Sequence, residues 1–334
     1  MLHRVRDDRE SRSLSGHKNN KRGTFMTLAT TSAPPRPGLR EKLQDALPKI
    51  VLAPSFAAIL VFVYGFILWT VYLSFTNSKT FPSYELTGGL AYQRLWGWTF
   101  ESDPPSSWYY SITNMAVFGV LYVGICLVLG LFIAILLDQR IRGEGILRPI
   151  YLYPMALSFI VTGVAWKWFL DPGLGLEATL HNLGWTSFHF DWIKNKDRVI
   201  YTVVIAGVWQ ASGFVMAMFL AGLRGVDGEI LKAAQIDGAS TFQVYWRIVI
   251  PILRPVFLSA FIVLAHMAIK SYDLVVALTS GGPGGSAWLP SNFMYEYTFK
   301  RNQMAIGSAS AVIMLMTISA IIVPYLYSEL REKK

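Results

Sequence analysis

Long runs of apolar residues alternate with shorter polar segments along most of this chain. Six of these runs are long enough to span a membrane as helices. They lie at about residues 50–76, 110–137, 147–170, 200–223, 253–279 and 305–328. About 20 helical residues cross the roughly 30 Å hydrocarbon core of a bilayer, and a segment in lipid must satisfy its own backbone hydrogen bonds. The pattern therefore predicts an all-α membrane protein with six transmembrane helices.

The composition supports this class and narrows the chemistry. Hydrophobic residues make up 53% of the 334 residues and charged residues only 15%, with a mean hydropathy of +0.39. The single cysteine, Cys126, lies within the second apolar run, which excludes an intrachain disulfide. No Gly-rich loop ends in Gly-Lys-Ser/Thr, so the chain has no P-loop for ATP hydrolysis. His181 and His189 have no Cys or carboxylate partners at zinc-binding spacing, and we expect no catalytic residue and no metal site.

The basic residues predict the orientation in the membrane. Of the 30 lysines and arginines, 21 lie in the two termini and in two loops, at residues 1–49, 138–148, 224–254 and 329–334. Positive charge accumulates on the cytoplasmic side of membrane proteins. Both termini and the loop after the fourth run are therefore expected in the cytoplasm. Because the net charge of +9 follows this topology, it indicates membrane lipid rather than nucleic acid as a partner.

The N-terminal segment differs from the rest of the chain. It is polar, charge-dense and interrupted by prolines, so residues 1–45 are expected to be a largely disordered cytoplasmic segment, followed by a six-span domain at residues 46–334. No short apolar core follows the early charges, so no cleavable signal peptide is expected. Met26 offers an alternative start of the chain, and the choice between Met1 and Met26 stays open.

The polar loop at residues 224–251 contains signals for helices and turns that a simple connection between two spans does not need. It contains Lys232-Ala233-Ala234-Gln235-Ile236-Asp237-Gly238-Ala239-Ser240, and prolines follow at its end. Good helix formers predict a short helix at residues 229–235, and Gly238 suits the left-handed conformation that ends a helix. A second helical stretch at residues 241–249 would place four apolar side chains on one anchoring side, namely Phe242, Tyr245, Trp246 and Val249.

This loop resembles the cytoplasmic coupling loop of permeases in binding-protein-dependent ABC importers, where Glu-Ala-Ala is followed three residues on by Asp-Gly-Ala and later by a Pro. In that family the short helix seats in a cleft of the ATP-hydrolysing subunit. The resemblance implies an ATPase-coupling role for Lys232, Ala233, Ala234, Asp237, Gly238 and Ala239. Lys232 departs from the usual Glu, so either the partner differs or Glu229 compensates for the reversed charge. An amphipathic helix lying on the membrane surface is the alternative.

Other segments resemble the sugar-importing members of the same family. Tyr272-Asp273-Leu274 precedes a Gly-rich turn at residues 279–284, and Leu52-Ala53-Pro54 opens the first run. Together with the end of the chain at residues 325–330, these segments look most like permeases of the maltose/glycerol-phosphate type, and among them those of glucose or α-glucoside systems. The resemblance implies a type I ABC importer transmembrane domain with its core at about residues 110–325.

The same resemblance implies the assembly in which such a subunit works. We expect a second homologous permease, two copies of an ABC ATPase and an extracytoplasmic sugar-binding protein, in the plasma (inner) membrane of a bacterium. ATP and Mg would bind to the ATPase, which leaves this chain without a cofactor and without enzymatic activity. Two rival classes fit the residues less well. A membrane-bound glycosyl or acyl transferase would need clustered carboxylates or a histidine dyad, and a secondary transporter usually shows paired repeats with interrupted helices.

Polar side chains inside the apolar runs are candidates for the sugar pathway, because burying Asp or Lys at mid-span costs about 2.5–3.5 kcal/mol. In the fifth run, His266, Lys270 and Asp273 follow i, i+4, i+7 spacing and are expected to share a face, and Lys270 can pair with Asp273. The full set of candidates is Trp209, Gln210, Ser212, His266, Lys270, Tyr272 and Asp273. The alternative is structural, with an ion pair and a hydrogen-bonded histidine in the fifth run and helix–helix packing in the fourth. The sequence leaves both open.

Overall fold

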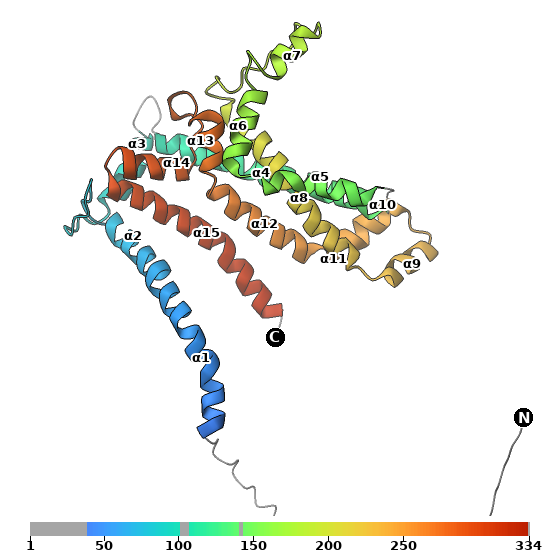
Figure 1. Cartoon of the computed structure of the whole chain (residues 1–334), viewed down its shortest axis with the longest axis horizontal. Helices are drawn as coiled ribbons and strands as arrows, with labels where there is room; N and C mark the ends of the chain where they lie inside the picture. Colours follow the sequence, from blue (N-terminus) through green and yellow to red (C-terminus); the bar gives the residue numbers. More distant parts are fainter. Residues whose placement is uncertain (1–38, 101–106, 140–142, 333–334) are drawn as a thin grey trace, which may run out of the picture. The chain divides into compact units, whose positions relative to one another are not determined.

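The computed structural model describes residues 39–100, 107–139 and 143–332, and these residues are mostly helical (Figure 1). Within these ranges no strand occurs beyond one isolated antiparallel bridge between Thr76 and Leu86. The predicted all-α class is therefore confirmed for the described part of the chain.

Four of the predicted spans correspond to long helices. By length and composition, the segments able to cross a membrane are Leu47–Ser74, Ser107–Asp138, Val199–Arg224 and Met304–Tyr327. The second and third are helices α4 (Ser107–Asp138) and α8 (Val199–Arg224), and the fourth lies within α15 (Met304–Glu332). Their bounds agree with the prediction to within a few residues, because a long apolar run with polar flanks specifies a spanning helix by itself.

The first crossing segment begins in α1 (Leu39–Ile59) and continues through a π-helical turn at Leu60–Gly65 into α2 (Phe66–Ser74). The chain divides after Ala57 into two units, and every site described below lies within the second unit. Residues 1–38, which include most of the segment expected to be disordered, lie outside the described residues. Helix α1 already begins at Leu39, before the predicted domain boundary at residue 46.

The predicted third span is not one helix. Helices α5 (Glu144–Ala156) and α6 (Phe159–Phe169) meet at a bend of 100°. Leu157 between them is extended, with ψ at 145°, and the Ser158 side chain accepts a hydrogen bond from the Val161 amide, 3.3 Å away. A serine in this position is a preferred N-cap, so it ends one helix and starts the next.

The predicted fifth span, residues 253–279, is also wrong as a single helix. It comprises α12 (Arg254–Ile269) and α13 (Asp273–Thr279), which are separated by the non-helical residues 270–272. Helix α12 is preceded by three short elements, α10 (Thr241–Val244), a π turn at Tyr245–Val249 and α11 (Ile250–Ile252). This stretch meets α12 at an angle of 65°, and with each bent pair counted as one span the described residues hold up to six candidate spans.

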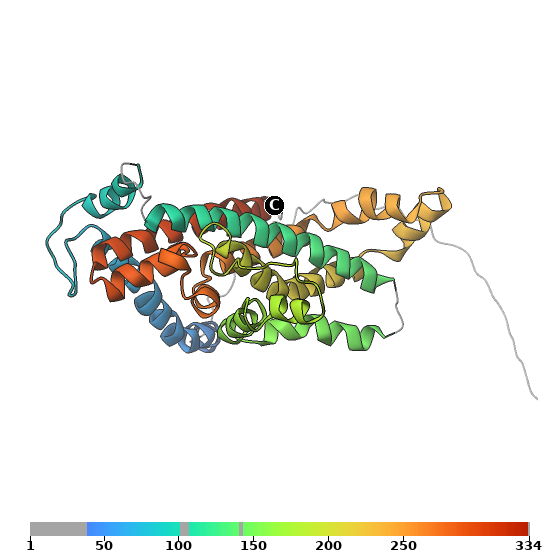
Figure 2. The ribbon, with the colours of Figure 1, turned by 90° about the horizontal axis from the view of Figure 1, so that it is seen from above.

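Helix α8 is central to the packing of the second unit. It packs against α4 and α5 (Figure 2). Its buried side chains include Val203 and Phe219. Gly213 of α8 faces the backbone of α5, because a Cβ at this position would lie only 1.8 Å from the carbonyl oxygen of Tyr151. Two helices in this arrangement require a residue without a side chain at the contact.

Replacing Gly213 with Ala should therefore destabilise the subunit. The two helices would have to separate, and overpacking of this kind costs about 1–3 kcal/mol, occasionally more. We expect a clearly lower melting temperature for the purified subunit in detergent, measured by tryptophan fluorescence. Gly124→Ala in α4 is the matched control, because a Cβ there meets no atom within 4 Å. Equal melting temperatures for the two variants would contradict the close approach.

Shorter helices complete the second unit. They are α3 (Leu90–Phe100), α7 (Leu176–Asn182), α9 (Gly228–Ile236) and α14 (Pro290–Tyr295), with a 3-10 turn at Pro283–Gly285 and a π turn at Glu296–Lys300. A second hydrophobic cluster joins α3, α4, α14 and α15 around Trp108 and Phe293, whose ring centroids are 4.9 Å apart. Helices α7 and α9 project from the packed helices at different places, and both carry residues considered below (Figure 1).

Candidate functional site

Helix α9 is fixed at both of its ends. The Asp227 side chain caps its N-terminus by accepting a hydrogen bond from the Glu229 amide at 2.9 Å. At the C-terminus the Ala239 amide donates to the Ala234 carbonyl at 3.0 Å, and the Gly238 amide donates to the Gln235 carbonyl at 3.1 Å. With φ at +79°, Gly238 takes the left-handed position of a Schellman motif. The predicted helix is confirmed, one residue longer at each end.

The segment after α9 folds differently from the prediction. Ser240 and Gln243 form a capping box that starts α10. The predicted anchors Phe242 and Trp246 are instead exposed, at 74% and 64%, and their rings stack on each other. The physical reason is the π turn at Tyr245–Val249, in which backbone hydrogen bonds join residues five apart instead of four. The segment therefore buries a different set of side chains from the set that an α-helix would bury.

The buried face of this segment is made by other residues. Val244 and Val249, five residues apart, are buried. Tyr245 is half-buried, and its hydroxyl donates to the Asp138 carboxylate at the end of α4, 3.1 Å away. These three side chains anchor the loop to the spans, so two of the four predicted anchors, Tyr245 and Val249, lie where the sequence placed them.

The six predicted coupling positions divide into two groups. Lys232, Ala233, Asp237 and Gly238 are exposed, whereas Ala234 is buried in the main hydrophobic core and Ala239 is half-buried against it. A partner could therefore contact these four exposed residues but not the Ala234 side chain.

Two apolar residues of α9 were missed by the sequence analysis. Ile236 is 86% exposed and Ile230 is 44% exposed. Helical periodicity could have identified Ile236, because it lies about 200° around the helix axis from the buried Ala234. The free side of α9 is therefore an apolar and charged surface made by Ile230, Lys232, Ala233, Ile236 and Asp237, which we call the α9 surface.

The loop is tied to the spans at its beginning as well. Arg224, the last residue of α8, donates to the Glu144 carboxylate at the start of α5, 2.5 Å away. Glu144 also forms an ion pair with Arg148 one turn further along α5. Lys232 and Glu229, by contrast, form no ion pair with each other in the described part of the chain, so Glu229 does not neutralise Lys232 within this subunit.

The predicted polar face of the fifth span is interrupted, because Asp273 belongs to a different helix from His266. His266 lies near the end of α12, Lys270 follows the end of that helix and Asp273 begins α13. All three are exposed, and Lys270 and Asp273 form no ion pair among the described residues. The i, i+4, i+7 spacing applies only to an unbroken helix, and the break at residues 270–272 removes it.

The break is stabilised by side chains of α14. Ser291 donates its hydroxyl to the Ser271 carbonyl at 3.2 Å, and the Asn292 amide donates to the Tyr272 carbonyl at 3.4 Å. The Tyr272 ring also packs on Tyr295, with centroids 4.9 Å apart. Non-helical backbone within a membrane domain requires such partners for its carbonyl groups.

The candidates in the fourth span have mainly structural contacts. Gln210 is buried, and its side-chain amide donates to the Leu157 carbonyl at 2.8 Å, which satisfies the backbone at the bend between α5 and α6. Trp209 is partly exposed and meets the Trp166 ring edge-to-face at 5.9 Å. Ser212 is half-buried. For Gln210 this geometry favours the packing interpretation.

One sizeable cavity of the second unit lies apart from these residues. It has a volume of about 700 Å³ and is lined by α4, α12 and α15, with apolar residues such as Met115, Phe261 and Ile313. None of the seven predicted pathway residues contributes to its wall. The single subunit therefore does not enclose the predicted pathway residues in this cavity.

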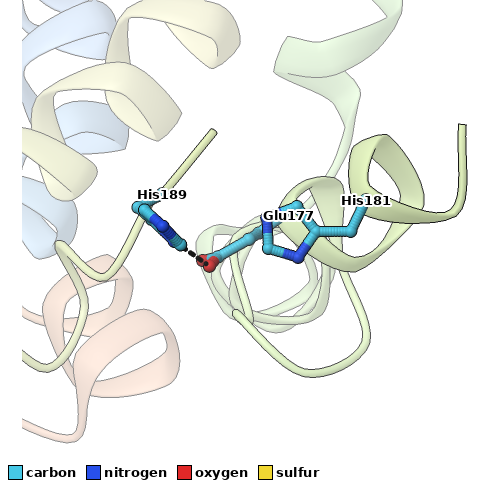
Figure 3. Close-up of side chains that lie close together, drawn as sticks. All are labelled: Glu177, His181 and His189. Carbon is cyan, nitrogen blue, oxygen red and sulfur yellow. Dashed lines mark hydrogen bonds and ion pairs between the residues drawn. The ribbon is translucent and has the colours of Figure 1, made fainter. Parts of the chain in front are cut away.

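The expectation that His181 and His189 lack a carboxylate partner is corrected by the structure. Glu177 precedes His181 by four residues on α7, and its carboxylate lies 3.1 Å from His189 Nδ1 (Figure 3). One possible ligand atom from each of the three residues lies within 4.8 Å of the others. The hydrogen bond from His189, followed by that from the Phe190 amide, lowers the pKa of Glu177.

The comparisons with known proteins agree on a single family. The family described as binding-protein-dependent transport system inner membrane component matches residues 126–332. A probable ABC transporter permease protein of Pyrococcus horikoshii is 40% identical over 84% of this chain and 95% of its own length. A xylose/arabinose import permease of Haloferax volcanii is 37% identical, over 66% of this chain and 69% of its own. A trehalose/maltose transport system permease of Thermococcus litoralis is 28% identical, over 83% and 91%.

The fold has a counterpart among solved structures. A chain of a bacterial ABC transporter involved in alginate import superposes with a TM-score of 0.74 over 88% of this chain and 99% of its own, at 17% identity. This likeness shows that the chain has the fold of a membrane-spanning domain of an ABC importer. The family model over residues 126–332 and the 40% identical relative show that the chain belongs to the inner-membrane components of binding-protein-dependent transport systems, and it is a permease subunit of an ABC transporter rather than an enzyme.

Proposed function

We propose that this chain is one of two related permease subunits in an ATP-driven sugar importer. The observation that carries the proposal is the α9 surface, a rigid helix face that exposes Ile230 and Ile236 next to a fixed Asp-Gly turn. An exposed apolar face on a rigid helix suits contact with a soluble protein partner. We propose that this partner is an ABC ATPase, of which the importer contains two copies for its two permeases. An extracytoplasmic sugar-binding protein completes the proposed assembly.

The contacts of the loop support a route for the coupling motion. The Schellman motif and the capping box connect α9 to α10 through hydrogen-bonded turns, and α10 continues towards α12. On the other side, Arg224 links the start of the loop to Glu144 of α5. A displacement of α9 by the ATPase would therefore reach α12 in one direction and α5 and α8 in the other, and the spans would alternate between inward-facing and outward-facing arrangements.

Lys232 provides a specific expectation about the ATPase. Because Glu229 does not neutralise it within this subunit, the Lys232 ammonium is available to the partner. A permease with the usual Glu at this position would face a basic residue of its ATPase. Because like charges across an interface are strongly unfavourable, we expect the ATPase that binds Lys232 to carry an acidic residue there instead.

The orientation and the substrate are parts of the same proposal. The distribution of lysine and arginine supports a cytoplasmic location for both termini and for α9. We propose glucose or an α-glucoside as the substrate, and the trehalose/maltose permease among the relatives supports this choice. Uptake of labelled glucose, maltose, trehalose and xylose by cells that express the complete transporter would distinguish this assignment from a pentose, which the xylose/arabinose relative would favour.

Co-purification tests the assembly. The tagged chain, extracted gently from its native membrane, should retain a P-loop ATPase and a second permease, both identified by mass spectrometry. Recovery of the chain alone, in good yield and with its native melting temperature, would favour a membrane-bound transferase or a secondary transporter instead.

The Asp273 carboxylate tests the proposed sugar pathway. Asp273 is exposed and forms no ion pair with Lys270, so Asp273→Asn should leave the melting temperature unchanged. If the carboxylate accepts a hydrogen bond from a sugar hydroxyl, its loss should raise KM for uptake at least about tenfold, because hydrogen bonds to charged groups contribute about 1.5–3 kcal/mol. Asp197→Asn, in the loop before α8, is the control. Unchanged uptake kinetics in Asp273→Asn would remove this residue from the pathway.

A further inference from the structure

The residues around α7 form a cluster that the proposed transport function does not use. Glu177 and His181 lie four residues apart on α7, so their side chains leave the same face of the helix. The chain then turns back through Gly184, whose φ of +97° favours glycine, and brings His189 to the same place (Figure 3). The three side chains therefore meet although the sequence separates them into two groups.

A hydrogen bond of His181 defines which of its two ring nitrogen atoms has a lone pair available. His181 Nε2 lies 2.7 Å from the Phe188 carbonyl oxygen. A carbonyl can only accept, so Nε2 carries the proton and donates it. In the neutral ring the lone pair is then on Nδ1 and is available to a metal ion. A backbone carbonyl that orients a histidine in this way is the usual outer partner of a metal-binding histidine.

Glu177 is oriented in a similar manner. Its Oε2 accepts a hydrogen bond from the Phe190 amide at 3.1 Å, while Oε1 faces His189 Nδ1, also at 3.1 Å. Two ligand atoms of a tetrahedral zinc ion lie roughly 3.3 Å apart when each bond is about 2.0–2.1 Å long. The observed separation of Oε1 and Nδ1 is thus close to that of two atoms that share one ion.

We propose that Glu177, His181 and His189 form a binding site for a divalent zinc-like cation. Two imidazoles and one carboxylate suit Zn²⁺, whereas Ca²⁺ and Mg²⁺ prefer oxygen ligands alone. Three protein ligands leave a fourth position for water. Binding transfers the proton of His189 from Nδ1 to Nε2 or to solvent, which its 74% exposed side chain allows.

The structural consequence is a cross-link within the segment that follows α6. The ion would join α7 to residues 188–190 and close the turn between them. The same turn carries a row of aromatic side chains, in which Phe190 stacks on Trp192 at 4.8 Å and Phe188 lies parallel to Phe190 at 6.4 Å. A bound ion would therefore fix the position of this aromatic row relative to α7.

Zinc binding to the full chain tests the proposal. The chain is purified in detergent with a tag that contains no histidine, treated with a chelator and titrated with Zn²⁺ against a chromogenic zinc indicator. We expect one ion per chain, and an affinity about a hundredfold lower in His189→Gln and in Glu177→Gln. His266→Gln is the matched control, because it removes an exposed histidine of α12 outside the cluster.

Melting temperatures show whether a variant that binds zinc weakly is still folded. Without zinc, His189→Gln should melt like the unsubstituted chain, and added Zn²⁺ should raise the melting temperature of the unsubstituted chain and of His266→Gln only. Unchanged zinc affinity in His189→Gln and Glu177→Gln would overturn the proposal and would point to the histidines outside the cluster, His3, His17 and His266. Failure of the unsubstituted chain to bind zinc would overturn it as well.

Discussion

Gly238→Pro should abolish ATP-driven uptake and leave insertion of the subunit into the membrane intact. Gly238 has φ at +79° and donates its amide to the Gln235 carbonyl. Proline fixes φ near −65° and has no N–H, so the turn between α9 and α10 cannot form. Strain and lost bonds of this kind cost on the order of 2–3 kcal/mol. The fraction of subunits whose loop can dock on the ATPase should therefore fall about thirty- to a hundred-and-fifty-fold.

Uptake of labelled sugar and the amount of subunit in the membrane fraction measure the two halves of this prediction. Gly228→Ala is the matched control in the same helix, since its backbone is not left-handed and a Cβ there meets no atom within 4 Å. Gly238→Ala should be intermediate, because it keeps the N–H but places a Cβ in the left-handed region at a cost of about 1–2 kcal/mol. Normal uptake in Gly238→Pro would contradict the coupling role of this loop.

Ile236→Asp should release the ATPase from the complex. Ile236 is 86% exposed in the isolated subunit, and burial of an isoleucine side chain against a partner contributes about 1.5–3 kcal/mol. Aspartate would lose this contribution and would also place a carboxylate in the interface. The ATPase should bind at least about tenfold more weakly. The stability of the subunit should not change, because the side chain contacts water in the absence of a partner.

The ratio of ATPase to permease after gentle purification measures this effect, and uptake should fall in parallel. Ile236→Leu is the control that keeps the apolar character and should retain the ATPase. If Ile236→Asp retains the ATPase at the native ratio and still transports, the partner does not bury the exposed side of α9, and an α9 lying on the membrane surface becomes the better interpretation.

Local sequence signals were sufficient for four of the six predicted spans and for α9. A long apolar run, a run of good helix formers at residues 229–235 and a glycine at position 238 each act within a few residues, so the structure follows them closely. The break at residues 270–272 could not be predicted from local sequence signals. It depends on Ser291 and Asn292, about twenty residues further along the chain, whose side chains satisfy the exposed carbonyls.

The candidate sites show the same division. Lys232, Ala233 and Asp237 were predicted as coupling residues from a contiguous motif, and the structure places all three on the exposed side of α9. Glu177 was missed because its relation to His189 exists only after the chain turns back at Gly184. The outward position of Trp246 was missed because a π turn has no clear signal in the sequence.

The contacts between α5 and α8 have a mechanical consequence. The two helices are joined at three heights: by Glu144 and Arg224 at one end, by the close approach of Gly213 to Tyr151, and by Gln210 at the bend after α5. Sliding or rotation of one helix against the other would break an ion pair, cause a backbone clash or expose a carbonyl group. We therefore expect α5 and α8 to move as one rigid body during the transport cycle, with the flexing confined to the bend before α6 and the break before α13.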